Sequence, residues 1–188
     1  MSGQTLVTED TIINGVNVTR LTETIQAIQG QADLAEFQFR AKNKWQTGGH
    51  NRAQINGFYG AGEEHTRNHP FEIEADEPPV LLGEDQAANP VEILLAALSG
   101  CLTTTLAYHA AANGIEIEGI DSEYEGDINA KGFLNLDSKA RKGLKEIRVN
   151  FKVKSEADRE KLAELAKFSP VFDTITNPTT VKLTVETV

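Results

Sequence analysis

This 188-residue chain has few residues that form cross-links, with one cysteine in the whole sequence. A single cysteine excludes a disulfide framework within the chain and is consistent with a reducing compartment. Positive charge is also scarce, because 18 Lys and Arg stand against 28 Asp and Glu, which gives a formal net charge of −10. Nucleic acids and anionic membranes attract basic proteins, so this charge argues against both as partners.

Residues 1–10 have neither the basic n-region nor the apolar h-region of a secretory leader, so we expect none. We therefore expect a cytoplasmic protein. One apolar segment, Val91–Ala112, is long enough to span a bilayer. It contains Glu92 and a run of three threonines, and a charged group is costly in hydrocarbon. A helix that is apolar nearly all round is better explained as the buried centre of a globular protein or of its oligomer.

The spacing of apolar residues predicts the secondary structure. Val18, Leu21, Ile25 and Ile28 recur at helical spacing before Gly30, which predicts a short amphipathic helix. Alternation predicts strands over Phe37–Trp45, Arg52–Tyr59, Phe71–Ala75, Ile115–Ile128 and Glu146–Lys154, and a last one in which Val181, Leu183 and Val185 alternate with polar residues. The glycine-rich stretch Gly60–Asn68 is predicted to be a loop.

Two further helices carry recognisable ends. Asn89 is a good N-cap, Pro90 suits the first helical position, Glu92 completes a capping box, and Asn113-Gly114 supplies the stop. A second helix is predicted from a cap in Ser155–Asp158 to about Phe168.

The pattern indicates one α+β domain over residues 36–188, preceded by an N-terminal arm with a short helix over residues 1–35. Apolar and polar residues alternate regularly in most strands, so one face of each strand is buried and the other is exposed to solvent. This favours antiparallel or mixed sheets over a doubly wound parallel sheet.

Cys101 lies in the middle of the long predicted helix. On a straight helix it shares a face with Leu94, Ala97, Leu98, Thr104, Thr105 and Tyr108. Free cysteines are among the most buried residues, so an inert core thiol is one interpretation. A reactive thiol is the other, and it needs a positive neighbour or a helix N-terminus. Cys101 lies about three turns from the N-terminus, so a cation would have to come from elsewhere in the fold.

The residues around this cysteine resemble a known family. The segment Asn89-Pro90-X-Glu-X-Leu-Leu-X-Ala-Leu-X-Gly-Cys101, continuing to His109-Ala-Ala-Ala-Asn-Gly-Ile, is similar to the central helix of the OsmC/Ohr family. The family is named for osmotically inducible protein C and for organic hydroperoxide resistance. Trp45–His50, as an early hairpin, and Phe168–Pro178 support the resemblance, which covers roughly Phe37 to Val188.

The resemblance implies a fold and a chemistry. Members of the family are intertwined homodimers in which two long buried helices pack together between antiparallel or mixed sheets that take strands from both chains. The peroxide-reducing members use a thiolate at the position of Cys101 to attack a hydroperoxide. The resulting sulfenic acid condenses with a second cysteine, and an external dithiol reduces the disulfide. An arginine from the early hairpin stabilises the thiolate, and a carboxylate orients that arginine.

This sequence departs from the family pattern at three positions. The second cysteine is replaced by Ser169, which cannot form a disulfide. The carboxylate expected ten residues before the thiol is Val91, and the neighbouring Glu92 is on nearly the opposite helix face from Cys101. We therefore interpret Glu92 chiefly as a capping residue. The arginine position after Gly48-Gly49 is His50.

Arg52 is our candidate cation, because a strand places it on the same face as His50, and Arg40 is the alternative. Thr105 and His109 are possible lining residues of the site or of the dimer interface. His65 and His69 have a spacing that could bind a metal, but they lack further ligands. We expect no metal and no organic cofactor.

Two functions follow as hypotheses. The first is a one-cysteine peroxidase, in which Cys101 reduces organic hydroperoxides, Arg52 assists ionisation and an external thiol restores the enzyme. The alternative is a non-catalytic homodimer of the same fold that binds a small apolar or electrophilic ligand between the central helices. A cysteine that only packs in a structural protein is the third interpretation.

Overall fold

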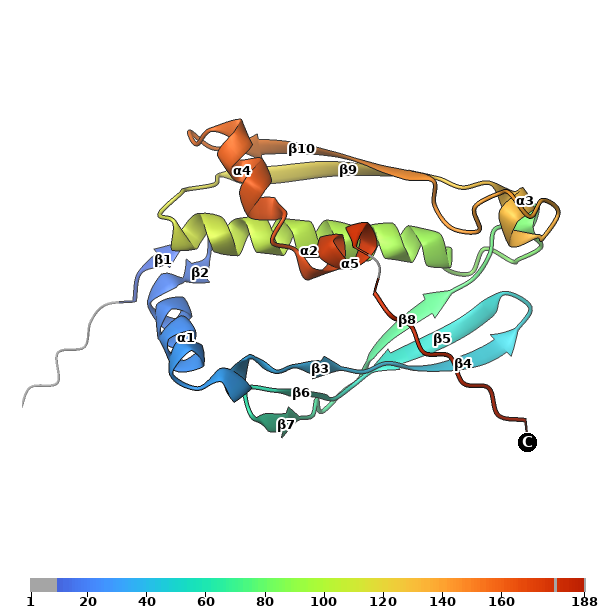
Figure 1. Cartoon of the computed structure of the whole chain (residues 1–188), viewed down its shortest axis with the longest axis horizontal. Coiled ribbons are helices and arrows are strands. Elements are labelled where there is room, and N and C mark those ends of the chain that lie inside the picture. The colour runs from blue at the N-terminus through green and yellow to red at the C-terminus, as the bar shows by residue number, and fades with distance from the viewer. Residues whose placement is uncertain (1–9, 178, 188) are drawn as a thin grey trace, which may run out of the picture. The chain divides into compact units, whose positions relative to one another are not determined.

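The computed structural model describes residues 10–177 and 179–187, so the first nine residues of the predicted arm lie outside the described part (Figure 1). The chain divides into two compact units, one up to Ala96 and one from Ala97. The long helix α2 (Pro90–Ala112) runs through the boundary and contributes its first turns to the first unit and the rest to the second.

Over residues 10–96, the first unit contains helix α1 (Val18–Gly30), the first turns of α2 and small antiparallel sheets. β1 (Ile12–Ile13) pairs with β2 (Val16–Asn17), and α1 follows, as the sequence predicts. One three-stranded sheet has the order β3 (Gln38–Phe39), β6 (Phe58–Gly60), β7 (Glu63–His65), and the other has the order β4 (Lys42–Thr47), β5 (His50–Ile55), β8 (Phe71–Ala75). Short turns of 3-10 helix are η1 (Ala32–Ala35) and η2 (Pro79–Leu81).

Three sequence-based boundaries in this unit were wrong. The strands predicted over Phe37–Trp45 and Arg52–Tyr59 are each broken in two, because the chain passes from one sheet to the other between their halves. Gly57 lies at one of these breaks, where an added Cβ would come within 2.9 Å of the His65 carbonyl oxygen. The predicted loop Gly60–Asn68 contains strand β7, which is too short to show alternation.

The ends of α2 are those that the sequence predicts. The Asn89 side chain accepts a hydrogen bond from the backbone N–H of Val91 at 2.7 Å, and Glu92 accepts one from the backbone N–H of Asn89 at 2.8 Å. This is a capping box. At the other end Gly114 adopts φ +68°, a left-handed conformation that glycine reaches without strain.

The second unit is built on a long antiparallel hairpin of β9 (Gly119–Asp127) and β10 (Glu146–Lys154), joined through the short helix α3 (Ala130–Phe133). α4 (Arg159–Ala166) and α5 (Pro170–Thr176) follow. Leu106 and Ala110 of α2 form the core with Leu162 and Leu165 of α4. Figure 1 shows the hairpin running along the same stretch of α2.

Two expectations in this unit need correction. Residues 179–187 form neither helix nor strand, and Val181, Leu183 and Val185 are 83%, 86% and 78% exposed. Alternation alone does not make a strand, because a strand also needs a free sheet edge to pair with. The helix predicted to reach Phe168 ends at Ala166, and α5 was missed although Ser169-Pro170 is a recognisable helix start.

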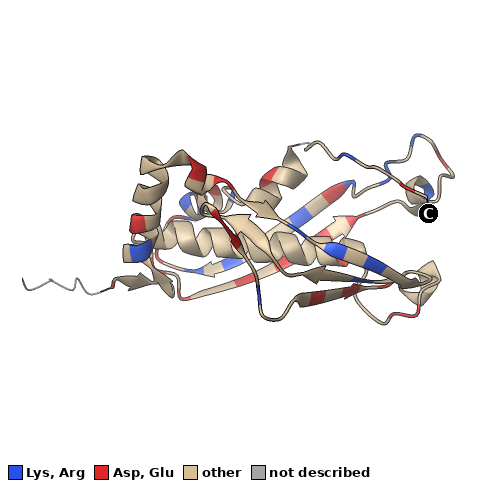
Figure 2. Cartoon of the chain, turned by 90° about the horizontal axis from the view of Figure 1, so that it is seen from below, with Lys and Arg blue, Asp and Glu red and all other residues tan. Residues whose placement is uncertain are grey.

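The expectation of a buried central helix holds for one side of α2. A stripe of buried residues, Leu98, Leu102, Leu106 and Ala110, repeats every four positions. Leu94 and Tyr108, in contrast, are 40% and 49% exposed. Figure 2 shows the helix almost free of charged residues. Its length and composition would suit a membrane span, but a core helix of a soluble protein has the same properties.

Candidate functional site

Cys101 lies at the boundary between the two sides of α2, and its thiol is free and half-buried. It is next in sequence to Leu102 of the buried stripe, about 100° away around the helix. It also shares a face with the exposed Leu94 and Tyr108. The thiol is therefore neither enclosed by the core of its own unit nor fully in solvent.

Thr105 and His109, which follow Cys101 on α2, were predicted to line the site or the dimer interface. Thr105 is half-buried one turn away. His109 is half-buried too, and its ring stacks on the ring of Phe168 with centroids 4.7 Å apart and an angle of 9° between planes. His109 thus has an aromatic partner within its own unit, which fixes the ring orientation. Glu92 is exposed and engaged in the capping box, in agreement with the structural interpretation.

A cluster of charged residues lies on the sheet β4-β5-β8 of the first unit. Arg52 on β5 stands opposite Glu74 on β8. The Arg52 Nε donates to Glu74 Oε1 at 2.8 Å, and one Nη donates to the same oxygen. The His50 Nε2 lies 3.2 Å from the other oxygen of Glu74. His50 and Arg52 therefore do share a strand face, as the sequence predicts.

The hydrogen bonds from Arg52, and secondly from His50, lower the pKa of the Glu74 carboxyl. Glu74 is thus an ionised group that binds the side chains of both Arg52 and His50. It was missed in the sequence because it lies 22 residues from Arg52. The signal that could have found it is the alternation of β8, which puts Glu74 on the polar face opposite Ile73.

Arg40, the alternative cation, is engaged elsewhere in the first unit. Its two Nη atoms donate to the carboxylate oxygens of Glu64 at 2.8 and 2.7 Å, and Nε donates to Gln38 at 3.0 Å. This fork of parallel hydrogen bonds raises the pKa of Arg40. Arg40 belongs to the surface of the sheet β3-β6-β7 and not to the cluster around Glu74.

Asp76 is a second carboxylate that the sequence did not single out. It is 2% exposed and accepts backbone N–H groups of Glu77, Glu84 and Gln86. These bonds, that from Gln86 first, lower the pKa of the Asp76 carboxyl. The arrangement fastens the loop between β8 and α2, so Asp76 is a structural anchor for the start of the long helix.

The comparison with known proteins now decides the family. The sequence pattern of the family described as OsmC-like protein matches residues 83–184, which is more than half of the chain. This chain belongs to the OsmC-like family. The matched segment includes Cys101 and Ser169, whereas Arg52 and Glu74 precede it. No curated protein matches the sequence of this OsmC-like chain.

Solved structures agree with the fold of this OsmC-like chain. An OsmC-like protein from Mycoplasma pneumoniae has a TM-score of 0.56 and 17% identity, over 75% of this chain and 89% of that one. An OsmC-like protein of unknown function from Vibrio cholerae gives 0.54 and 14%, over 73% and 92%. A Psychrobacter arcticus protein named for osmotic stress induction and detoxification gives 0.53 and 20%, over 71% and 85%. These likenesses show the fold.

Ser169, which the family resemblance sets at the second cysteine's position, has a structural role in this OsmC-like chain. It is fully buried, and its hydroxyl oxygen accepts a hydrogen bond from the backbone N–H of Phe172 at 3.2 Å. Ser169 is thereby the N-cap of α5, and Pro170 follows at the first helical position. Ser169 therefore serves as a helix cap in this structure.

His65, one of the two histidines with metal-like spacing, has partners of another kind. The His65 Nε2 lies 3.0 Å from the carbonyl oxygen of Gly60, and its ring stacks on Phe58 with centroids 4.6 Å apart. Over residues 10–177 and 179–187, no three His, Cys, Asp or Glu side chains come together as a set of metal ligands.

Proposed function

We propose that this OsmC-like protein is a cytoplasmic one-cysteine peroxidase that reduces organic hydroperoxides through Cys101. The observation that carries the proposal is a free, half-buried thiol on the exposed border of the central helix of an OsmC-like domain. Partial burial gives an apolar substrate a surface to contact, and partial exposure gives a reductant access.

The reaction balances with an external thiol as reductant. The Cys101 thiolate attacks the distal oxygen of the hydroperoxide, the O–O bond breaks, and the alcohol leaves after taking up a proton. Cys101 is then a sulfenic acid. A first external thiol displaces water and forms a mixed disulfide, and a second thiol releases the reduced Cys101 and an external disulfide. Ser169 takes no part, because its hydroxyl cannot form a disulfide.

Arg52 is proposed to supply the positive charge that favours the thiolate. The support is its fixed orientation, since the Glu74 carboxylate holds it by two hydrogen bonds and His50 completes the cluster. A guanidinium with one edge bound to a carboxylate keeps its remaining N–H groups for a second anion. In the assembled protein this second anion is proposed to be the Cys101 thiolate.

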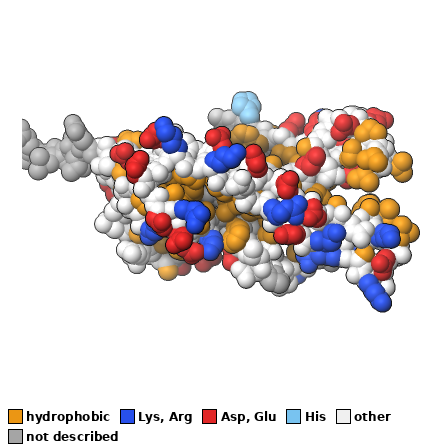
Figure 3. Space-filling view, turned by 90° about the horizontal axis from the view of Figure 1, so that it is seen from above, with side chains coloured by type: hydrophobic (Ala, Val, Ile, Leu, Met, Phe, Trp, Pro, Cys, Tyr) orange, Lys and Arg blue, Asp and Glu red, His pale blue; other side chains and the backbone are white. Residues whose placement is uncertain are grey.

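A homodimer is part of the proposal. The apolar side of α2 that carries Leu94 and Tyr108 is exposed in the single chain, and so is the alternating segment around Leu183. Apolar side chains reach the surface in several patches between charged ones (Figure 3). Large exposed apolar surface marks an interaction site, and a second copy that covers these parts would also bury α2 more fully.

The test is turnover of cumene hydroperoxide with dithiothreitol as reductant. The wild type should consume peroxide and Cys101→Ser should not, while Thr103→Ser on the same helix serves as a control that keeps the thiol. Dimedone should trap a sulfenic acid on Cys101 after one equivalent of peroxide. Equal rates for the wild type and Cys101→Ser would exclude the proposal.

Ser169 in place of a resolving cysteine favours a second candidate, a non-catalytic dimer of the same fold that binds a small apolar or electrophilic ligand between the central helices. In that case an apolar ligand raises the Tm of the wild type and of Cys101→Ser equally, because ligand binding stabilises the folded state. Hydroperoxide turnover would then be absent from both proteins.

A further inference from the structure

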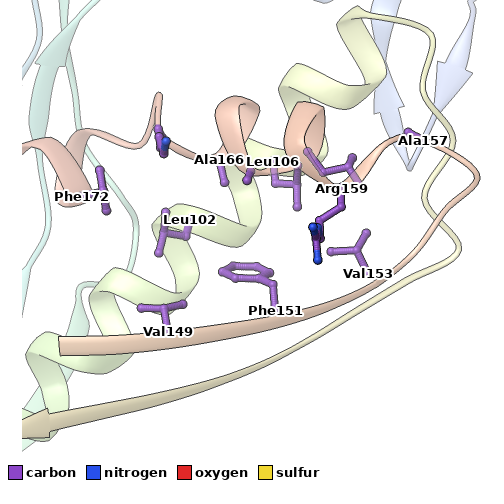
Figure 4. Close-up of a pocket in the computed structure, with 12 residues that line it drawn as sticks. Leu102, Leu106, Val149, Phe151, Val153, Ala157, Arg159, Ala166 and Phe172 are labelled. Carbon is purple, nitrogen blue, oxygen red and sulfur yellow. The ribbon is translucent and has the colours of Figure 1, made fainter.

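The second unit contains an apolar cavity of about 550 Å³ that is separate from Cys101. It lies between the buried stripe of α2, the inner face of β10, and helices α4 and α5 (Figure 4). Its volume falls within the range of about 300–1,000 Å³ that small-molecule sites occupy. Cys101 is not among the residues that line it.

One side of the cavity follows β10. Val149, Phe151 and Val153 are alternate residues of this strand, and all three line it. At about 3.3–3.4 Å per residue they span roughly 13 Å. Leu102 and Leu106, one turn apart on α2, line another side. The walls are thus those of a channel for a linear apolar chain.

One arginine adds a positive charge to the mostly apolar lining of this channel. Arg159, the first residue of α4, lines the cavity and in Figure 4 points toward Phe151 and Val153. Among the described residues no carboxylate lies within ion-pair distance of its guanidinium, and it takes part in no hydrogen bond through its side chain. The other lining cation, Lys167, is bound to Glu164 at 2.6 Å.

Three other arginines differ from Arg159 in this respect. Arg52, Arg40 and Arg148 are each held by a carboxylate, at 2.8 Å or less in every case. Arg67 and Arg141 also have no carboxylate partner among the described residues, so Arg159, whose side chain is exposed, is set apart by its place on the lining of an apolar channel. An anion that enters this channel gains hydrogen bonds from a planar guanidinium without competition from an internal partner.

We infer that the cavity binds a linear amphipathic carboxylate, with the acyl chain along Val149, Phe151 and Val153 and the carboxylate on Arg159. Apolar walls with one placed charged group are the usual make-up of a small-molecule site. The acyl chain supplies most of the free energy by burial, and Arg159 fixes the end of the chain that carries the charge. The inference does not rest on the proposed peroxidase activity, because Cys101 takes no part in it.

The experiment titrates decanoate into the full-length protein by calorimetry, with decan-1-ol as the neutral probe of equal chain length. Decanoate should bind more tightly than decanol. Arg159→Gln should weaken decanoate at least about tenfold and leave decanol unchanged. Lys161→Gln, which removes a charge of the same sign from an exposed position of the same helix, should leave both unchanged.

Two more variants test whether the probes occupy this cavity and whether Cys101 is involved. Ala163→Leu adds a larger side chain at an exposed lining position of α4 and should weaken both probes by narrowing the channel. Cys101→Ser should bind both probes as the wild type does, and this separates the cavity from the peroxidase proposal. Higher salt should weaken decanoate more than decanol.

Three results would overturn the inference. Equal affinity for decanoate and decanol would make the site a plain apolar groove without anion recognition. Unchanged decanoate binding in an Arg159→Gln protein that circular dichroism shows to be folded would mean that Arg159 does not bind the carboxylate. Binding of neither probe would mean that protein fills the cavity, either the apolar segment of residues 179–187 or a second copy of the chain.

Discussion

Arg52 and Glu74 face each other across the neighbouring strands β5 and β8, and Arg52 Nε donates to Glu74 Oε1 at 2.8 Å. The pair gives this chain an arginine oriented by a carboxylate, although both positions differ from those that the family resemblance names. Under the proposed function, Glu74 on the sheet orients the arginine, whereas the family resemblance implies a carboxylate on the central helix for that role.

The first prediction concerns the choice of arginine. Arg52→Lys should lower peroxide turnover at least about tenfold, because lysine cannot keep two hydrogen bonds to Glu74 and present further N–H groups. Arg40→Lys is the matched control, since Arg40 is also held by a carboxylate, on the other sheet. Steady-state rates with cumene hydroperoxide measure both. A larger loss of turnover in Arg40→Lys would show that Arg40, and not Arg52, assists the ionisation of Cys101.

The second prediction concerns Glu74 and pH. Its carboxyl pKa is lowered in the folded protein, so ionised Glu74 stabilises the fold at pH values above the ordinary glutamate range. This stabilisation is lost as the pH falls through the lowered pKa. Glu74→Gln should therefore have a lower Tm than the wild type at pH 7, and the difference should shrink in acid.

Glu72→Gln is the control for that experiment, because Glu72 lies two residues away on the same strand and bonds the neutral amide of Gln54. It should change Tm less than Glu74→Gln at pH 7. A Tm difference between the wild type and Glu74→Gln that persists or grows in acid would contradict the assignment of the pKa shift to the ion pair.

The third prediction concerns the cap of α5. Ser169→Ala removes the acceptor for the Phe172 N–H and should cost about 0.5–2 kcal/mol in the free energy of unfolding. Urea denaturation measures the change. Because Ser169 has no part in the proposed reaction, turnover by the folded variant should equal that of the wild type. A loss of turnover without a loss of stability would give the hydroxyl a direct role.

The fourth prediction concerns Tyr124, whose ring meets the edge of Phe151. Its hydroxyl oxygen is buried, and no group in the described residues hydrogen-bonds it. A buried polar group without a partner costs about 1–3 kcal/mol, so Tyr124→Phe should raise the Tm of the protein. A lower Tm would reveal that the hydroxyl is bonded in solution, to water or to a second copy.

The local elements could be predicted because their causes are local. The capping box of Asn89 and Glu92, the stop at Gly114 and the alternation of β10 depend on residues within a few positions of one another. The same holds for Ser169-Pro170, which marks the start of α5, although this signal was overlooked. The resemblance to the family came mainly from one continuous segment, the helix that contains Cys101, with Trp45–His50 and Phe168–Pro178 in support.

What joins distant parts of the chain was decided by the tertiary structure alone. Glu74 became the partner of Arg52 through the register of β5 on β8, and Arg159 meets Phe151 only because α4 packs over β10. Strand register and helix packing depend on contacts between distant residues, for which a single sequence carries no periodic signal. The sequence determined the thiol, the helix and the family, and the packing decided which charges act together and which one faces an apolar channel.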